Sequence, residues 1–265
     1  MQEVSNAYAT STGKPGRQTL GSYQWITEAH PDVIDKAAYL FIAGEVTEQA
    51  TARVRNATSE HLGWDWIYVQ DIDIAETNYA PFVLEMRDRG VEYVTFQGAY
   101  QQGVRLAEAM QQQGFEPEVY ELQSNAYTPA TVELGGSAMD GTYISLANVM
   151  FEEVDQHPEL QRYLAALQQV APGSSPDGLG VYGWSAAKLF MEIAKRVGPE
   201  LTREAVLAEL ADFGEWDGGG LHPPRNIATQ EPTACFVMTQ IQGGEFVRAH
   251  PSDGFDCSGD VVDVS

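Results

Sequence analysis

The stretch Ala37-Ala-Tyr-Leu-Phe-Ile-Ala43, followed by Gly44 and a helix-period segment at 45–62, sets the pattern of the first half of the chain. A short apolar run, a few polar or glycine residues and a helical segment recur in this order. The other apolar runs are 64–70, 91–97, 118–123 and 142–147. Runs of this length, rich in Val, Ile, Tyr, Phe and Trp, are typical of buried parallel strands. The repeat predicts an α/β fold, a parallel sheet covered by helices.

The second half of the chain changes character after residue 147. Helix-period apolar stripes predict helices at 158–171 and 185–197, and a third helix after Thr202, a good N-cap residue. An antiparallel hairpin is expected from strands 234–240 and 245–249 around Gly243 and Gly244. The sequence supplies these helices with no parallel strands to cover. We therefore expect their apolar faces to lack part of their usual packing partners.

Composition excludes several classes of partner. The chain has 265 residues, with 38 acidic and 15 basic residues and a net charge of −23. Such a surface repels nucleic acid and anionic membranes, because it offers no cluster of Lys or Arg to replace phosphate counterions. The charge is typical of proteins that need high solubility or salt tolerance, and steering of a cationic ligand is the alternative. No run approaches the roughly eighteen apolar residues of a membrane span, and residues 1–21 lack the pattern of a signal peptide.

The two cysteines, Cys235 and Cys257, lie 22 residues apart without histidines at metal spacing, so a zinc site is disfavoured. They form either one disulfide or two unpaired thiols. A disulfide would indicate an oxidising compartment.

The loops after the predicted strands are the candidate ligand sites, since ligands of open parallel sheets bind at the carboxyl ends of strands. None has the G-x-G-x-x-G phosphate turn, so no dinucleotide cofactor is expected. Small polar groups and open helix N-termini favour a small polar organic ligand. Asp71, Asp73 and Glu76 present a metal or acid/base alternative, against the simpler interpretation as solvated loop carboxylates.

Catalytic arrangements are absent from the sequence pattern. The five histidines are scattered, and none is paired with a serine or cysteine nucleophile. Gly183-Trp184-Ser185 lacks the second glycine and the preceding strand of a nucleophile elbow. Tyr182 and Trp184 stand at a helix start behind a glycine-rich loop, where aromatic rings either line a cleft or pack in a core. We predict a binding protein, with no cofactor and no metal.

Three stretches resemble a known family. They are Gly141-Thr-Tyr-Ile-Ser-Leu-Ala-Asn148, Val181-Tyr-Gly-Trp-Ser-Ala-Ala-Lys-Leu-Phe190 and Val91-Glu-Tyr-Val-Thr-Phe-Gln-Gly-Ala-Tyr100. Together with the order of elements from about residue 23 to 247, they are similar to the type I periplasmic binding proteins, within them the leucine/isoleucine/valine-binding group that serves ABC importers. The resemblance implies two Rossmann-like lobes that grip a ligand between them, with closure as a hinge motion.

The resemblance also implies a division of the chain and a set of site residues. Residues 1–37 would be a remnant of the first lobe and the first crossover, 38–145 a complete second lobe, 146–231 the helical part of an incomplete first lobe, and 232–265 a hairpin and tail returning to the second lobe. The implied ligand-binding residues, with the two aromatic candidates added, are Glu45, Val46, Ala99, Tyr100, Ser124, Asn125, Tyr182 and Trp184. Ser124 takes the place of the acidic residue that holds the ammonium group in amino-acid binders. The implied ligand is therefore a branched-chain amino acid, an amide or a related molecule.

We accordingly expect an extracytoplasmic solute-binding protein that works with ABC permease subunits. The extracytoplasmic habit of the resembled family favours the Cys235–Cys257 disulfide. The parent protein is expected to be longer, with a signal sequence and most of the first lobe. The alternatives are a ligand-binding domain of a receptor or regulator on the same fold, and a metal-dependent α/β enzyme.

Overall fold

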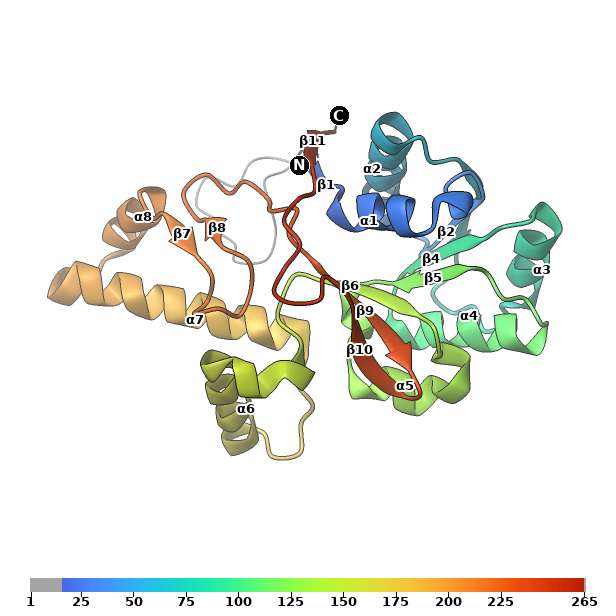
Figure 1. Ribbon diagram of the computed structural model, residues 1–265. Coiled ribbons are helices and arrows are strands. Elements are labelled where there is room, and N and C mark those ends of the chain that lie inside the picture. The colour runs from blue at the N-terminus through green and yellow to red at the C-terminus, as the bar shows by residue number, and fades with distance from the viewer. Residues whose placement is uncertain (1–15, 265) are drawn as a thin grey trace.

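The core of the protein is a seven-stranded mixed sheet, seen in a computed structural model that describes residues 16–264 (Figure 1). The strand order is β10-β9-β6-β5-β4-β2-β3. Five of its strands are mutually parallel: β2 (Ala37–Ile42), β3 (Trp66–Ile72), β4 (Tyr93–Gln97), β5 (Val119–Leu122) and β6 (Tyr143–Leu146). They coincide closely with the five apolar runs, so the predicted parallel sheet is confirmed. Residues 1–15 of the predicted N-terminal unit 1–37 lie outside the described residues.

The remaining two strands come from the C-terminal hairpin. β9 (Val237–Gln242) pairs antiparallel with β6, and β10 (Glu245–His250) forms the edge of the sheet. The two-residue turn between them consists of Gly243 and Gly244, whose φ angles of 59° and 85° are strained for any residue with a Cβ atom. The hairpin prediction is confirmed, although its first strand begins three residues later than expected.

The strand β3 also differs in its bounds from the expected 64–70. Helix α2 (Glu45–Leu62) ends at Gly63, which has a φ of 74°, and Trp64 then turns into the core against Tyr23. The strand therefore starts at Trp66 and continues to Ile72. Asp71 is consequently a strand residue, paired with Phe41 of β2, and not a loop residue.

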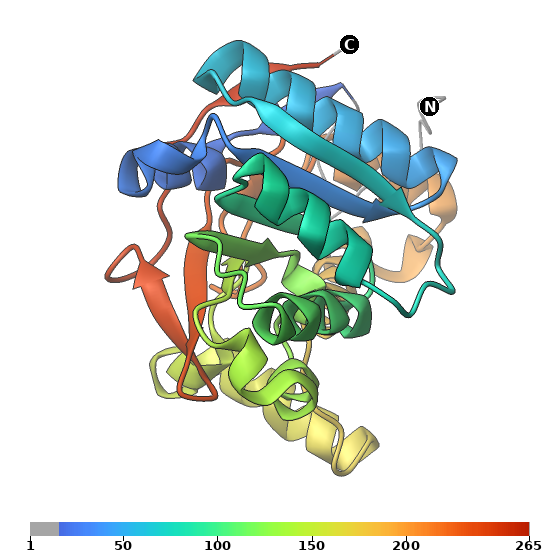
Figure 2. The same cartoon turned by 90° about the vertical axis from the view of Figure 1, so that its right-hand side faces the viewer.

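Helices cover both faces of this sheet, as Figure 2 shows for α2 above the strands and α4 below them. Helices α1 (Gly21–Ala29) and α2 lie on one face. The other face carries α3 (Ala80–Arg89), α4 (Tyr100–Gln112) and α5 (Pro129–Gly135). Side chains alternate along each strand: Leu40 enters the α3–α5 core, whereas Ala37 packs in the α1–α2 core. We call this part, residues 17–146 with 237–250, the sheet lobe.

The helical region, residues 147–231, lies beside the sheet lobe (Figure 1). Its elements are η4 (Phe151–Gln156), α6 (Pro158–Val170), α7 (Gly178–Val197), η5 (Gly198–Glu200), α8 (Arg203–Ala211), β7 (Glu215–Trp216) and β8 (Arg225–Asn226). The helix α7 begins seven residues before the predicted start at 185, because the Asp177 carboxylate accepts a hydrogen bond from the Gly180 amide at 2.7 Å and caps it. Thr202 caps α8 as predicted, accepting from the Ala205 amide at 3.2 Å.

The helical region packs mainly on itself. Leu160 of α6 and Val181 of α7 are buried in one cluster, and Leu189 and Ile193 of α7 are buried in another with Phe213. The described residues of this region contain only the two-stranded β7–β8 ribbon and no parallel strand. Apolar side chains remain exposed, including Val170 at 82% and Phe190 at 52% of their surface. Of the predicted stripes, Val170 and Phe190 thus lack cover, whereas Leu160, Leu189 and Ile193 are buried, so the expected shortage of cover is limited to a few positions.

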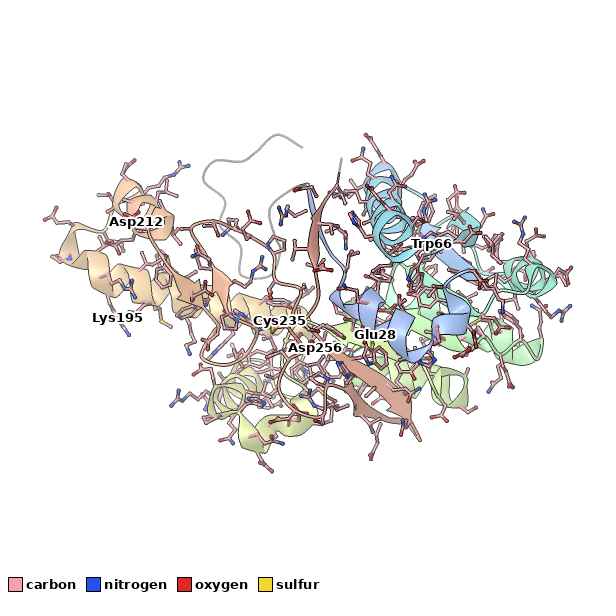
Figure 3. All side chains as sticks on the ribbon, turned by 45° about the horizontal axis from the view of Figure 1, so that its top comes forward. Glu28, Trp66, Lys195, Asp212, Cys235 and Asp256 are labelled. Carbon is pink, nitrogen blue, oxygen red and sulfur yellow. A yellow bond between two sulfur atoms is a disulfide. The ribbon has the colours of Figure 1, made fainter. Side chains whose placement is uncertain are left out.

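A second ribbon and a disulfide lie where the two parts meet. β1 (Arg17–Thr19) pairs antiparallel with β11 (Val261–Asp263), and Cys235 is bonded to Cys257 with an S–S distance of 2.06 Å. Figure 3 places Cys235 and Asp256 close together at this junction. Of the two alternatives for the cysteines, the structure has the disulfide. Short 3₁₀ turns complete the chain: η1 (Pro31–Val33), η2 (Ser124–Ala126) and η3 (Gly136–Met139).

Candidate ligand-binding site

Three predicted ligand loops meet at the carboxyl edge of the sheet, because β5, β4 and β2 are adjacent strands. The loops lead into η2, α4 and α2, respectively. The Asn125 side-chain amide donates to the Gly98 carbonyl at 2.8 Å and so joins the loops after β5 and β4. Thr47 fixes the loop after β2, since its hydroxyl lies 2.6 Å from the Ile42 carbonyl and 2.8 Å from that of Gly44.

Most of the predicted residues on these loops face solvent. Glu45, Val46, Ala99, Ser124 and Asn125 are exposed, Val46 to 76%. The aromatic ring among them, Tyr100, is half-buried against the α3–α5 core. The N-termini of α2 and α4 carry free backbone amides and the positive end of each helix dipole, which favour acceptor groups of a ligand. This edge offers hydrogen-bond donors, one acidic side chain and apolar contacts from Val46 and Tyr100.

The two aromatic candidates of the helical region differ in their surroundings. Trp184 donates from Nε1 to Oε1 of Glu159 at 2.8 Å and packs on Tyr163, so it is held between α7 and α6. Tyr182 is half-buried with its ring 6.1 Å from that of His222, and burial raises the pKa of its hydroxyl to about 12. The helix α7 that carries both passes next to η2 of the sheet lobe. The structure therefore brings α7 to the loop of Ser124 and Asn125.

A cavity of about 260 Å³ lies inside the sheet lobe, between α1, α2 and the sheet. Of the eight predicted ligand-binding residues, only Ser124 lines it. The cavity is polar, because it is bordered by Gln97, Glu121 and Ser145 together with hydroxyl groups from the start of α1. It adjoins the exposed loops only at Ser124.

The sequence predictions missed the buried polar groups around this cavity. Glu121 of β5 is 5% exposed and accepts a hydrogen bond from the Tyr93 hydroxyl at Oε2. Burial raises the pKa of Glu121 to about 7, although the hydrogen bond from Tyr93 acts in the opposite direction. Gln97 accepts at Oε1 from the hydroxyls of Tyr39 and Thr51, both at 3.1 Å. An acidic residue inside a short buried strand, Val-Tyr-Glu-Leu, was the signal that could have revealed this cluster.

The carboxylates proposed as a metal alternative stabilise a turn. Asp73 accepts from the Ala75 amide at 2.8 Å, and Glu76 accepts from the Thr77 and Asn78 amides at 2.8 and 2.7 Å. Within residues 16–264, no group of three or more His, Cys, Asp or Glu side chains is arranged to hold a metal ion. The geometry favours the interpretation as loop carboxylates for Asp73 and Glu76, whereas Asp71 belongs to β3.

One histidine does have a serine partner, contrary to the sequence prediction. Ser185 Oγ lies 2.7 Å from Nε2 of His222 and accepts from the Trp216 indole at 2.9 Å. The pair escaped prediction because the two residues are 37 positions apart and meet only through the fold of the helical region. Ser185 is 0% and His222 2% exposed, and desolvation lowers the pKa of His222. This buried network binds the loop after β7 to α7 and offers no nucleophile to a substrate.

Comparison with known families identifies the chain. A family model described as periplasmic binding protein matches residues 7–245. The chain belongs to the periplasmic binding protein family. No curated protein matches the sequence. In the described part of this family member, none of the helices combines the length and apolar character of a membrane span.

Solved structures share the fold at low sequence identity. A leucine binding protein from Thermotoga maritima is 15% identical with a TM-score of 0.68, over 87% of this chain and 64% of that one. A fatty acid ABC transporter substrate-binding protein from Thermomonospora curvata is 19% identical with a TM-score of 0.75, over 90% and 62%. A branched chain amino acid ABC transporter protein from Thermus thermophilus, with bound valine, is 14% identical with a TM-score of 0.74, over 90% and 64%. The chain spans less than two thirds of the length of these proteins. The similarity over this part, together with the family match, confirms the type I periplasmic binding fold.

Proposed function

We propose that this protein is an extracytoplasmic solute-binding protein of an ABC importer, which captures a small polar organic ligand between two hinged lobes. The observation that carries the proposal is the meeting of three polar loops at one edge of the sheet, joined by the hydrogen bond from Asn125 to Gly98. Membership of a family of binding proteins supports non-covalent capture. The Cys235–Cys257 disulfide supports an oxidising, extracytoplasmic compartment.

The proposal gives each part of the chain a role. Residues 38–145 form one lobe and present Glu45, Val46, Ala99, Tyr100, Ser124 and Asn125 to the ligand. Residues 146–231 contribute to the facing lobe through Tyr182 and Trp184, and residues 232–265 return to the first. Permease subunits of the importer are the protein partners. A neutral hydroxyl at Ser124 favours an amide or a related polar ligand alongside branched-chain amino acids.

A thermal-shift screen tests the proposed function. The protein is mixed in turn with branched-chain amino acids, amides, urea and aromatic acids, and the midpoint of unfolding is measured. A true ligand at 100 times its dissociation constant stabilises the folded state by about 2.7 kcal/mol, which raises the midpoint by several degrees. No shift with any member of the panel up to millimolar concentration would contradict the proposed solute class.

The aromatic residues offer a sharper test once a ligand is known. Tyr100→Ala and Tyr182→Ala should each weaken binding by roughly 1–3 kcal/mol, because a ring beside the ligand loses contact area. Phe190→Ala on the exposed face of α7 serves as the matched control and should leave affinity unchanged. Calorimetric titration gives the affinities and far-UV circular dichroism checks the fold. A sharp fall in the melting temperature with intact affinity would place both tyrosines in the core.

A further inference from the structure

A row of polar side chains crosses the sheet on the face covered by α1 and α2. Tyr39 of β2 pairs in register with Thr95 of β4, and Thr95 pairs in register with Glu121 of β5. The same face is otherwise packed with aromatic and aliphatic side chains such as Tyr93 and Val119. Polar residues in a buried face cost free energy unless their hydrogen bonds are satisfied. This row therefore requires a partner.

Two atoms of the row lack one. Thr95 Oγ1 is buried without a hydrogen-bond partner. The hydrogen bond that Glu121 receives within the described residues comes from Tyr93 and ends at Oε2. Its Oε1 accepts none there, but it is not among the fully buried atoms without a partner, and Glu121 lines the cavity. The side chain of Glu121 forms no ion pair with any Lys or Arg of the described residues. A carboxylate in this position is 5% exposed and has neither counter-charge nor full hydrogen bonding.

The cavity supplies space for a partner of Glu121, whereas Thr95 does not line it. Both Glu121, which is buried, and Ser124, which is exposed, line the cavity. The cavity therefore extends from the Glu121 side chain to the edge of the sheet at which the parallel strands end. Arg53 also lines it, but this half-exposed side chain donates from Nε to the Gln49 carbonyl of its own helix at 3.3 Å. The volume of about 260 Å³ is just below the roughly 300–1,000 Å³ of sites for drug-sized ligands. A ligand of a few heavy atoms fits this size.

We propose that this cavity binds a small organic ammonium ion, whose N–H groups donate to Glu121 and to the hydroxyls of the cavity wall. An ionised carboxylate only accepts hydrogen bonds, and a primary ammonium presents three donors with the complementary charge. An anionic ligand would be repelled by the same carboxylate. The site lies within the sheet lobe, beneath α1 and α2, and shares only Ser124 with the loops proposed to hold the transported solute. The inference goes beyond the proposed function and does not rest on it.

Titration calorimetry with propylammonium chloride tests the site, at about pH 8 and about 150 mM NaCl to screen the acidic surface. The protein should bind propylammonium, whereas 1-propanol, its uncharged analogue, should bind at least roughly tenfold more weakly. Glu121→Gln keeps the acceptor for Tyr93, removes the charge, and should weaken propylammonium binding roughly tenfold or more. Glu118→Gln is the matched control, because Glu118 is an exposed carboxylate that faces His30 at 2.8 Å. Glu118→Gln should change the affinity for propylammonium by less than about twofold.

A steric variant keeps the test valid if Glu121→Gln alters the fold. Ala50→Leu enlarges a side chain of α2 that lines the cavity, leaves Glu121 in place, and should abolish propylammonium binding. Equal binding of propylammonium by the natural protein and both variants would overturn the proposal, as would a complete absence of binding. The two proposals fail separately, since the ammonium site is tested at Glu121 and the solute site at Tyr100.

Discussion

The sheet lobe and the helical region each bury a glutamate that is 5% exposed, Glu121 and Glu159. The two differ in their hydrogen-bond partners and in the direction of their pKa shift. Glu121 has one uncharged donor, the Tyr93 hydroxyl, and burial raises its pKa to about 7. Glu159 of α6 accepts from Lys188 at 2.8 Å, Arg162 at 2.9 Å and Trp184 at 2.8 Å. Burial acts to raise the pKa of Glu159, but the hydrogen bonds from these three donors outweigh it and leave the pKa lowered.

The difference shows how each part is stabilised. The sheet lobe has two continuous cores on the faces of one sheet, and it retains an acid that costs free energy when ionised. The helical region has two smaller clusters and exposes apolar side chains on α6 and α7. Its helices are joined by ion pairs around the buried carboxylate of Glu159 and by a buried hydrogen-bond network at Ser185. Stability should therefore depend on apolar area in the sheet lobe and on specific polar contacts in the helical region.

The largest expected effect comes from truncating an aromatic ring in the sheet lobe. Phe96→Ala removes a side chain that is 1% exposed and should lower the free energy of unfolding by about 3–5 kcal/mol. Phe190→Ala, the same change on α7 at 52% exposure, should cost less than about 1 kcal/mol. Urea unfolding measures both values. Equal costs would mean that the helical region is packed as tightly as the sheet lobe.

The next effect is the pH dependence contributed by Glu121. Because its pKa of about 7 in the folded state exceeds the ordinary 4.5, the folded protein retains a proton that the unfolded chain releases. The free energy of unfolding should therefore fall by about 3 kcal/mol as pH rises from about 4.5 to about 7. Glu121→Gln should remove this fall. The free energy of unfolding of the variant, relative to that of the natural protein, should therefore be higher at pH 8 than at pH 4.5. Parallel curves for both proteins would contradict the assignment.

Glu159 should show the opposite behaviour. Its lowered pKa contributes stability that is present above the unfolded-state pKa and is lost as pH falls. Lys188→Met removes the closest cation from a buried carboxylate and should cost about 1–3 kcal/mol near neutral pH. Lys195→Met, on the same helix but exposed, is the control and should be nearly neutral. A loss shared by both variants would point to the overall charge of the protein, and away from the ion pair.

The smallest effect concerns the helix starts. In the sheet lobe α2 and α4 begin without a side-chain cap, at Gly44 and Ala99, whereas α8 begins with Thr202. Thr202→Ala should cost about 1 kcal/mol, and Thr202→Ser, which keeps the hydroxyl, should cost less than about 0.5 kcal/mol. Thermal unfolding of the two variants compares them. An equal loss would show that the methyl group, and not the cap, matters.

The parallel part of the sheet could be predicted from sequence because each of its five strands lies within or close to a mainly apolar run flanked by glycine or polar residues. The period-2 and period-3.6 patterns are local, so 37–43 and 45–62 indicate their elements without knowledge of the rest of the chain. The start of α7 was missed because Gly178, Gly180 and Gly183 disfavour a helix, and the cap at Asp177 outweighs them there.

The site could be predicted only as far as strand order allows. Loops after parallel strands lie at one edge of the sheet, so the loops of Ala99 and Ser124 could be named as candidate ligand loops. The contacts of Glu121 and of Ser185 join residues from separate elements, and no spacing rule identifies such pairs. The cavity likewise depends on how α1 and α2 sit on the sheet, which no single segment encodes.

The disulfide has a consequence for proteolysis. Cys235 and Cys257 enclose the whole β9–β10 hairpin, whose exposed turn at Gly243 and Gly244 is its most accessible peptide segment. A protease that cuts this turn would leave two polypeptides still held by one covalent bond, with each strand still paired in the sheet. The nicked protein would migrate as one band on a non-reducing gel and as two after reduction. The disulfide would thus keep β10 attached to the sheet after cleavage of the turn.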